Sequence, residues 1–281
     1  MSKRTAEIAA PSSPVGDRRQ MTHLDPPPHV PPFRPCVPDQ DVTGRYGFAW
    51  RGPGEFYARL IVDDLESLGA SSGPTVLDIG CGGGLLGARI WQQAIAARAG
   101  CYIGVEPDTA AEPAPVFARV HPHTFEEAPI DAASVDLAYA AMVLEHVRQP
   151  ADFFAKLADV VRPGGVFWAF TVDRRHYFSW CSELLGALRL KDRYLDRVRG
   201  RRGEHLARYD NFPVFYRCNS PAALRRLAGN EFSLQTWSLH RLGQLDGYVP
   251  YRLRRLSRMA DRIIIRAHLP GSVLVARMVR R

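Results

Sequence analysis

The stretch Thr75-Val76-Leu77-Asp78-Ile79-Gly80-Cys81-Gly82-Gly83-Gly84 decides the fold of this chain. An apolar strand leads into a carboxylate and then into a glycine-rich turn. Glycine allows a tight turn with positive φ and lets a ligand lie against bare main chain. We expect Leu85–Ala97 to form a helix, so that the unpaired N–H groups of its first turn face the same ligand. A strand, a glycine loop and a helix in this order predict a binding site for a nucleotide-type ligand.

Two glycine patterns overlap in this loop. Gly82, Gly84 and Gly87 fit the loose G-x-G-x-x-G pattern of dinucleotide-binding folds. Asp78, Gly80, Gly82 and Gly84 fit Asp-x-Gly-x-Gly-x-Gly, which resembles the first motif of class I S-adenosylmethionine (SAM) methyltransferases. A carboxylate suits the ammonium group of SAM and would be unfavourable beside a pyrophosphate. The alternative without a ligand is an ordinary connection between a buried strand and a helix.

Composition and charge narrow the class of protein. A chain of 281 residues with 46% hydrophobic residues fits one sizeable domain with extensions. It has no apolar run long enough for a transmembrane helix and no signal-peptide core. The five cysteines lack paired spacing, so we expect neither a zinc site nor disulfides, and a cytoplasmic location. Residues 241–281 hold ten Arg and two Asp, which equals the net charge of +8 for the whole chain.

The order of elements predicts an α/β fold. Alternating strands and helices indicate a parallel sheet with helices on both faces. With the resemblance above, we expect a Rossmann-like, seven-stranded class I methyltransferase sheet with a helical cap or insertion after the fifth strand. We divide the chain into a disordered Pro-rich extension (1–40), a SAM-binding core (41–173), a cap (174–230) and a C-terminal completion of the sheet with a basic helix (231–281). The expected strands are Thr75–Ile79, Cys101–Val105, Thr124–Phe125, Val135–Ala140, Val166–Thr171, Phe232–Leu239 and Ser272–Met278.

Motifs after the glycine loop indicate whether the expected ligand is a dinucleotide such as NAD or is SAM. Glu106 ends the second strand, where an acidic residue accepts hydrogen bonds from ribose hydroxyls in both NAD and SAM folds. The segments Ser134–Tyr139, Val143–Val147 and Arg162–Gly165 then follow in the order and spacing of small-molecule methyltransferases. The chain therefore resembles the class I family that includes the ubiquinone and menaquinone biosynthesis enzymes. The resemblance covers residues 55–173 well and the C-terminal third loosely.

The resemblance implies roles for the residues around the loop. Asp78, with Gly80, Gly82 and Gly84, would border the methionine moiety of SAM, and Glu106 would hold the ribose.

The same resemblance places residues 124–127 beside the adenine. Thr124 stands where many relatives have an adenine-binding Asp, so Glu126 would substitute or the contact would be through the main chain. Phe125 would stack on the base or pack in the core.

Three residues are candidates for catalysis, all after strands at the edge where doubly wound folds bind ligands. His146 would act as a general base or orient the acceptor, or else pack beneath the site. His176 and Tyr177 follow the fifth strand and are alternative bases, unless they form an ordinary polar loop. Arg174 and Arg175 beside them would suit an acidic acceptor.

We predict no metal ligand in this region. Some relatives place a Glu three residues before the Glu-His pair and bind a divalent cation with the trio. Here that position is Met142, whose side chain cannot replace the carboxylate oxygen that a divalent cation such as Mg²⁺ prefers.

The sequence thus predicts a SAM-dependent methyltransferase acting on a small molecule, with O-methylation slightly favoured over C- or N-methylation. The alternatives are an RNA methyltransferase, suggested by the basic tail, and a methyltransferase for a lipid-linked or quinone-like substrate at the membrane surface. A non-catalytic SAM-binding regulator is less favoured, as is a nucleic-acid partner.

A basic helix at Tyr251–Arg262 could contact a membrane as a peripheral partner. We favour the interpretation that this helix packs its apolar side against the domain and leaves its arginines in solvent. The sequence does not indicate an oligomeric state.

Overall fold

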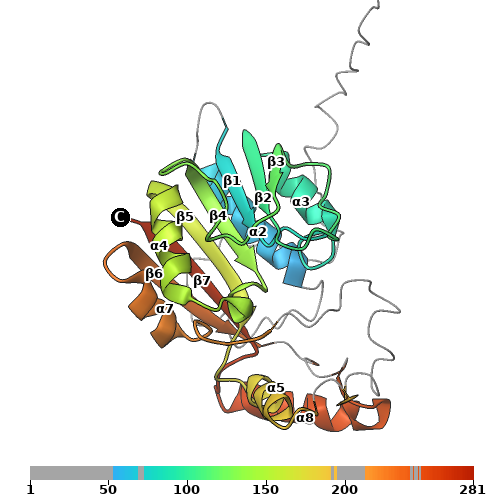
Figure 1. Cartoon of the computed structure of the whole chain (residues 1–281). Coiled ribbons are helices and arrows are strands. Elements are labelled where there is room, and N and C mark those ends of the chain that lie inside the picture. Colours follow the sequence, from blue (N-terminus) through green and yellow to red (C-terminus); the bar gives the residue numbers. More distant parts are fainter. Residues whose placement is uncertain are drawn as a thin grey trace, which may run out of the picture. The chain divides into compact units, whose positions relative to one another are not determined.

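The computed structural model describes residues 53–68, 73–190, 193–194, 213–240, 243, 246 and 248–281. In this part of the chain seven strands form one sheet in the order β3-β2-β1-β4-β5-β7-β6, shown in Figure 1. All neighbouring strands are parallel except β7, which is antiparallel to both β5 and β6. The strands are β1 (Thr75–Ile79), β2 (Cys101–Val105), β3 (Arg119–His121), β4 (Val135–Ala141), β5 (Val161–Val172), β6 (Phe232–Leu239) and β7 (Val273–Arg280). This arrangement confirms the predicted Rossmann-like, seven-stranded class I methyltransferase sheet.

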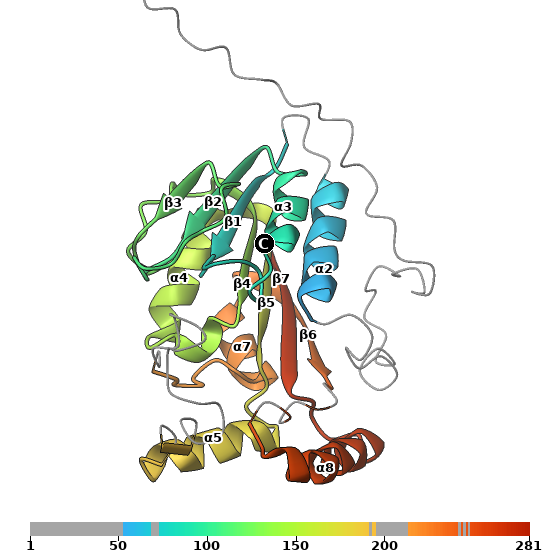
Figure 2. The same cartoon turned by 90° about the vertical axis from the view of Figure 1, so that its right-hand side faces the viewer.

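Helices cover both faces of the sheet and one of its edges. Figure 2 shows α2 and α3 on one face, α4 and α7 on the other, and α5 with α8 beside the end of β5. Because β5 runs directly into α5 and α8 leads into the antiparallel β7, both of these helices lie at the carboxyl edge of the parallel strands. The helices are α2 (Pro53–Leu68), α3 (Arg89–Ala96), α4 (Pro150–Val160), α5 (Tyr177–Ala187), α7 (Pro221–Ala228) and α8 (Arg254–Arg266), with 3-10 turns η1 (Leu144–His146) and η2 (Tyr251–Leu253).

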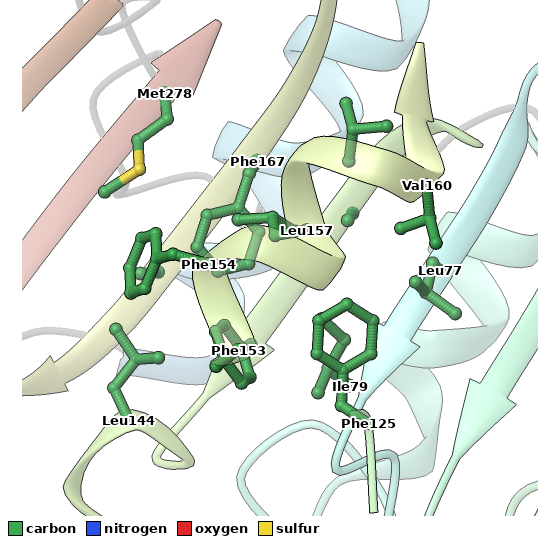
Figure 3. Packing of buried hydrophobic residues seen from close by; sticks show 14 of the residues in the cluster. Leu77, Ile79, Phe125, Leu144, Phe153, Phe154, Leu157, Val160, Phe167 and Met278 are labelled. Atoms are coloured by element: carbon green, nitrogen blue, oxygen red, sulfur yellow. The ribbon is translucent and has the colours of Figure 1, made fainter. Parts of the chain in front are cut away.

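One face of the sheet packs against α4 and α7. The apolar residues of α4 recur at helical spacing, so Phe153 and Leu157 reach the sheet together. They meet Phe167 of β5 and Leu77 of β1 in one buried cluster, which Figure 3 shows from close by. Leu224 of α7 belongs to the same cluster. Burial of each such side chain stabilises the fold by about 1.5–3 kcal/mol.

The opposite face of the sheet carries aromatic side chains. One carboxylate of α2, that of Asp64, binds side chains of two strands on this face. Because side chains alternate along β5, Trp168 and Phe170 point away from the α4 side. Tyr57 of α2 stacks on Phe170 with 4.0 Å between ring centroids. Asp64 of α2 accepts hydrogen bonds from Trp168 Nε1 at 2.7 Å and from Arg277 Nε of β7 at 2.7 Å. This carboxylate therefore connects one helix to two antiparallel strands.

The helix after the glycine loop begins later than the sequence predicts. It starts at Arg89 and not at Leu85. Gly84, Leu86 and Gly87 have φ angles of 134°, 51° and 80°, which a right-handed helix cannot contain. The loop is therefore longer than predicted.

The third strand was also misplaced. It covers Arg119–His121, while the predicted Thr124–Phe125 lies in the turn that follows. Pro122 has no N–H, so hydrogen bonding to β2 ends at His121.

The favoured interpretation of the basic helix was wrong. In α8 the buried residues are Ser257 and Asp261, and the apolar side chains of Leu256, Met259 and Ile263 are 52–60% exposed. The buried Asp261 accepts hydrogen bonds from the Tyr177 hydroxyl and from the N–H of Gly243, so polar contacts help to hold this helix to the domain. No helix among the described residues is long and apolar enough to span a bilayer. The predicted Pro-rich extension 1–40 lies outside the described residues.

Candidate functional site

The glycine loop is held against the ends of β2 and β4. The N–H groups of Gly80 and Cys81 donate to the carbonyl oxygen of Val105 at 2.8 and 3.1 Å. Gly80 has a φ of 75°, and a Cβ added there would lie 2.5 Å from Cγ2 of Val143, just after β4. A Cβ on Gly84 would lie 2.7–2.8 Å from the main chain of Ala88. Bare main chain is therefore required at both of these predicted cofactor-binding glycines.

Asp78 lies beneath this loop in a cage of hydrogen-bond donors. Its Oδ2 accepts from Tyr139 Oη at 2.6 Å, Gln92 Nε2 at 2.8 Å and Tyr102 Oη at 3.2 Å. Gln92 also donates to the carbonyl oxygen of Cys81 at 2.7 Å and so joins Asp78 to the loop. The carboxylate is only 3% exposed. The geometry shows Asp78 supporting the loop from below, and direct contact with the methionine moiety stays a prediction.

Burial changes the acidity of this cluster. Removal of the Asp78 carboxylate from water raises its pKa from 3.8 to about 6, although the hydrogen bond from Tyr139 acts in the opposite direction. Burial also raises the pKa of Tyr139 and of Tyr102 well above 10. Asp78 therefore changes charge near pH 6 while both tyrosines remain hydrogen-bond donors.

Glu106 connects the end of β2 to the glycine loop. Its Oε2 accepts from the N–H of Gly82 at 2.7 Å and its Oε1 from the N–H of Asp108 at 3.1 Å. The side chain is half-buried, and its backbone N–H donates to the carbonyl oxygen of His121 in β3. The structure thus places this carboxylate beside the loop at the carboxyl edge, as the sequence predicts.

The residues predicted to flank the adenine form a turn after β3. Phe125 is buried against Phe153, with 4.8 Å between ring centroids. Of its two predicted roles, core packing is the one that the structure shows. Glu126 is half-buried beside it, and Thr124 Oγ1 donates to Glu127 at 3.1 Å. Contact of Glu126 with a base stays a prediction.

Three buried polar side chains meet at the carboxyl ends of β4 and β5. Thr171 Oγ1 donates to Glu145 Oε2 at 2.7 Å, and Asn219 Nδ2 donates to Thr171 Oγ1 at 2.6 Å. Burial raises the pKa of Glu145. The buried Oδ1 of Asn219 has no hydrogen-bond partner among the described residues. A polar cluster thus lies at this edge, next to His146.

His146 ends the 3-10 turn after β4. Its Nδ1 lies 3.1 Å from the carbonyl oxygen of Pro213. Because a carbonyl can only accept, Nδ1 carries the proton and Nε2 is the basic nitrogen of the neutral ring. The ring is half-buried. This geometry fits a base at the carboxyl edge.

His176 and Tyr177 are engaged in holding helices. Nδ1 of His176 accepts from the N–H of Phe178 at 3.2 Å and caps α5, and burial lowers the pKa of this ring to about 4. The Tyr177 hydroxyl donates to Asp261 Oδ1 of α8 at 2.6 Å. Burial raises the pKa of Tyr177 as well. Both groups thus have structural contacts, and a catalytic role for either stays a prediction.

The arginines after β5 also have partners. Arg175 donates from Nε and Nη2 to the two oxygens of the buried Asp173 at 3.0 and 2.7 Å. Arg174 forms an ion pair with Glu183 of α5 at 3.2 Å. Both arginines therefore have carboxylate partners within the protein, and binding of an acidic acceptor by either one stays a prediction.

No group of three metal-binding side chains is present in the described residues. Met142 stands at the position where some relatives have a Glu. Its φ is 59°, and its backbone N–H donates to the carbonyl oxygen of Phe170 at 2.7 Å.

Sequence reasoning missed the partners of the site residues. Gln92, Tyr102 and Tyr139 around Asp78, and Thr171 and Asn219 around Glu145, were not singled out. One signal was present, because Tyr102 and Tyr139 are large polar residues in otherwise apolar strands.

Comparisons of the sequence with known proteins identify the family to which this fold and glycine loop belong. Residues 54–218, more than half of the chain, match the family described as "Methyltransferase domain". Ubiquinone biosynthesis O-methyltransferase of Aromatoleum aromaticum is 33% identical over 167 residues, which cover 53% of this chain and 67% of that protein. The enzyme of the same name from Methylobacterium sp. (strain 4-46) is 36% identical over 112 residues, covering 37% and 43%. The chain spans about half the length of several such curated relatives.

Solved structures show the same fold. Geranyl diphosphate C-methyltransferase from Streptomyces coelicolor A3(2) matches with a TM-score of 0.50 and 17% identity, covering 81% of this chain and 76% of that chain. At this identity the likeness concerns the fold alone. Together with the family match and the glycine loop, it leads to one conclusion: the chain belongs to the class I SAM-dependent methyltransferases.

Proposed function

We propose that this protein transfers a methyl group from SAM to a small-molecule acceptor, with a hydroxyl oxygen as the favoured acceptor atom. The observation that carries the proposal is the glycine loop closed by Glu106 at the carboxyl edge of the sheet. The names of the matched relatives, which are O-methyltransferases, support the choice of oxygen.

The residues present fit this cofactor. SAM has a cationic sulfonium centre, a ribose and an amino-acid tail, and it carries no phosphate. Main chain without side chains lines the loop at Gly80 and Gly84, where a Cβ would clash. The Glu106 carboxylate beside Gly82 can exchange its main-chain donors for ribose hydroxyls. Asp78 beneath the loop adds negative charge, which favours a cation over a pyrophosphate.

The chain's own contribution to the reaction is orientation. When bound, SAM supplies a methyl group on a positively charged sulfur, so no metal is required for activation. The loop and Glu106 would fix the donor, and the polar cluster of Glu145, Thr171 and Asn219 would border the acceptor. Positioning of two reactants in this way contributes roughly 7–11 kcal/mol in favourable cases.

A hydroxyl acceptor needs a base, and His146 is the best placed of the three predicted candidates. Its Nδ1–H points to the carbonyl oxygen of Pro213, and in this tautomer Nε2 is the nitrogen that would accept a proton. Nδ1 of His176 instead accepts from the main chain, and Tyr177 is bound to Asp261. We therefore assign proton acceptance to Nε2 of His146 and regard His176 and Tyr177 as positioning residues.

Turnover with a metabolite extract tests the proposal. We expect S-adenosylhomocysteine to form when the purified protein, SAM and a bacterial metabolite extract are combined. Mass spectrometry should then find a product heavier by one CH₂ that survives ribonuclease treatment of the extract. Product that appears only with RNA would contradict a small-molecule acceptor, and silence across many extracts would contradict methyl transfer.

A further inference from the structure

The exposed half of α8 is divided into an apolar stripe and a basic stripe. Leu256, Met259 and Ile263 are spaced by three and four residues, so they follow one line along the helix. Each of these side chains is more than half exposed. Arginines follow a neighbouring line with the same kind of spacing, at positions 255, 258, 262 and 266.

Most of this positive charge forms no ion pair with the part of the chain that the structure describes. The segment 251–266 has six arginines and one aspartate, and that aspartate, Asp261, is buried. Arg258 forms an ion pair with Asp246. Arg255, Arg262 and Arg266 are exposed and form no ion pair with another described residue.

A second apolar stripe runs along α5 to its C-cap residue, Leu188. Trp180, Leu184 and Leu188 are spaced by four residues, and their side chains are 56–63% exposed. Figures 1 and 2 show α5 and α8 next to each other beyond the end of β5. The hydrogen bond from Tyr177 to Asp261 joins the two helices. We call the exposed residues of these two helices the α5–α8 surface.

We propose that the α5–α8 surface binds the surface of an anionic lipid bilayer. A helix with a large apolar stripe beside a row of arginines suits the boundary between acyl chains and phosphate head groups. Trp180 is of the residue type enriched at that boundary. The proposal extends the function above without depending on it, because binding to lipid requires no cofactor.

Charge and chemistry argue against two other occupants. In a symmetric pair of this chain the same surface would meet itself, and the unpaired arginines of both copies would repel each other. Nucleic acid would neutralise the arginines but would leave Leu256, Met259 and Ile263 in water. An anionic bilayer would bury the apolar stripe among its acyl chains and would neutralise the arginine stripe with its phosphate groups.

The position of this surface has a consequence for the site. Because α5 follows β5 directly, the surface lies at the same sheet edge as Glu145 and His146. A bilayer bound there would lie next to the edge from which an acceptor enters. The proposal therefore identifies an acceptor that partitions into lipid as the first class to test.

Flotation with vesicles tests the proposal on the full chain. We expect the protein to float with vesicles of phosphatidylcholine and phosphatidylglycerol at low salt, and far less with phosphatidylcholine alone. The variant Arg255→Gln/Arg262→Gln should bind about fivefold more weakly for each arginine removed. Leu256→Gln/Ile263→Gln should reduce the binding that persists at high salt. Matched controls on other faces are Arg225→Gln/Arg226→Gln of α7 and Ile90→Gln of α3, which are exposed as well.

Fluorescence adds a second readout for α5. Vesicles of the anionic mixture should shift the tryptophan emission of the protein to the blue, and Trp180→Phe should remove most of that shift. Equal binding to neutral and anionic vesicles, or equal losses in the control variants, would overturn the proposal. So would a wild-type protein that ignores vesicles and forms a dimer that Leu256→Gln/Ile263→Gln dissociates.

Discussion

The carboxylate of Glu106 accepts a hydrogen bond from the backbone N–H of Gly82 at 2.7 Å. This contact joins the end of β2 to the glycine loop that follows β1, across two neighbouring parallel strands. A ribose that replaces the Gly82 donor would lie between the loop and the second strand. If Glu106 binds the ribose as we propose, this one side chain would couple the loop geometry to ribose binding.

Substitution of Gly84 by Ala should disrupt the loop. The added Cβ would lie 2.7 Å from the main chain of Ala88, and a φ of 134° is unfavourable for alanine. We expect SAM affinity to fall at least tenfold and the free energy of unfolding to fall by roughly 1–3 kcal/mol. Calorimetric titration and urea unfolding measure the two effects. Gly186→Ala in α5, where an added Cβ meets no atom within 4 Å, is the matched control and should bind SAM normally.

Asp78→Asn should change how stability depends on pH. The folded-state pKa of Asp78 is raised to about 6 from 3.8, so its stabilising contribution is complete below about pH 3.8 and is lost as the pH rises through 6. Asparagine does not titrate. The wild type should therefore lose stability relative to the variant between pH 4 and pH 7, by on the order of 3 kcal/mol.

Urea unfolding of both proteins at several pH values measures this difference. A difference that is independent of pH would contradict a buried, titrating Asp78. Asp78→Ala is less informative, because it removes the buried acceptor that Gln92, Tyr102 and Tyr139 share and so destabilises the core.

His146→Gln and His176→Gln should separate catalysis from structure. Loss of a general base in His146→Gln should lower kcat by about 10²–10⁴-fold with a hydroxyl acceptor. His176→Gln should leave the pH dependence of kcat/KM between pH 5 and 8 unchanged, because burial lowers the pKa of His176 to about 4. Steady-state rates across this pH range provide the comparison. Equal losses in both variants would exclude His146 as the specific base.

The lowered pKa of His176 also predicts how the stability of the fold changes with pH. Since its folded-state pKa lies below the usual 6.5, the folded protein should lose stability as the pH falls from 6.5 towards 4. His176→Gln has no group that titrates at this position. The variant should therefore lose less stability between pH 7 and pH 5 than the wild type does. Thermal unfolding at pH 7 and pH 5 checks this direction. A larger acid loss in the variant would contradict a buried neutral ring.

Asp64→Asn should weaken the fold without affecting the site. Asp64 pairs with Arg277 and accepts from Trp168, so its loss leaves half-buried donors poorly paired. We expect a loss on the order of 2 kcal/mol in the free energy of unfolding and unchanged SAM affinity. Glu66→Gln on the same helix removes an exposed pair with Arg98 and should cost much less. Similar losses in the two variants would contradict the role of Asp64.

The sequence predicted the parts of the site that lie in one continuous motif. Asp78 to Gly84 and Glu106 could be recognised because a strand, a turn and a carboxylate follow each other along the chain. Phe232–Leu239 was placed correctly because its strand pattern is strong and isolated. Local patterns were therefore sufficient to locate most of the strands, whereas the seven-stranded sheet and the cofactor were expected from the family resemblance.

Partners that come from distant strands were not predictable. Tyr139 meets Asp78 because these two residues stand opposite each other in the register of β4 and β1. No spacing in the sequence encodes that register. The exposure of Leu256 and Ile263 was misjudged for a similar reason, since α8 turns Asp261 towards Tyr177 of α5, a partner that lies 84 residues away in the sequence.

The most direct test of the account is a calorimetric titration of SAM into the wild type, Glu106→Gln and Glu112→Gln. Glu112 is an exposed carboxylate on the same connection after β2 and serves as the control. We predict one SAM bound per wild-type chain, the same affinity in Glu112→Gln, and at least tenfold weaker binding in Glu106→Gln with the fold intact. Equal affinity in all three proteins, or a wild type that does not bind SAM, would contradict the assignment of the glycine loop and Glu106 as the methyl-donor site.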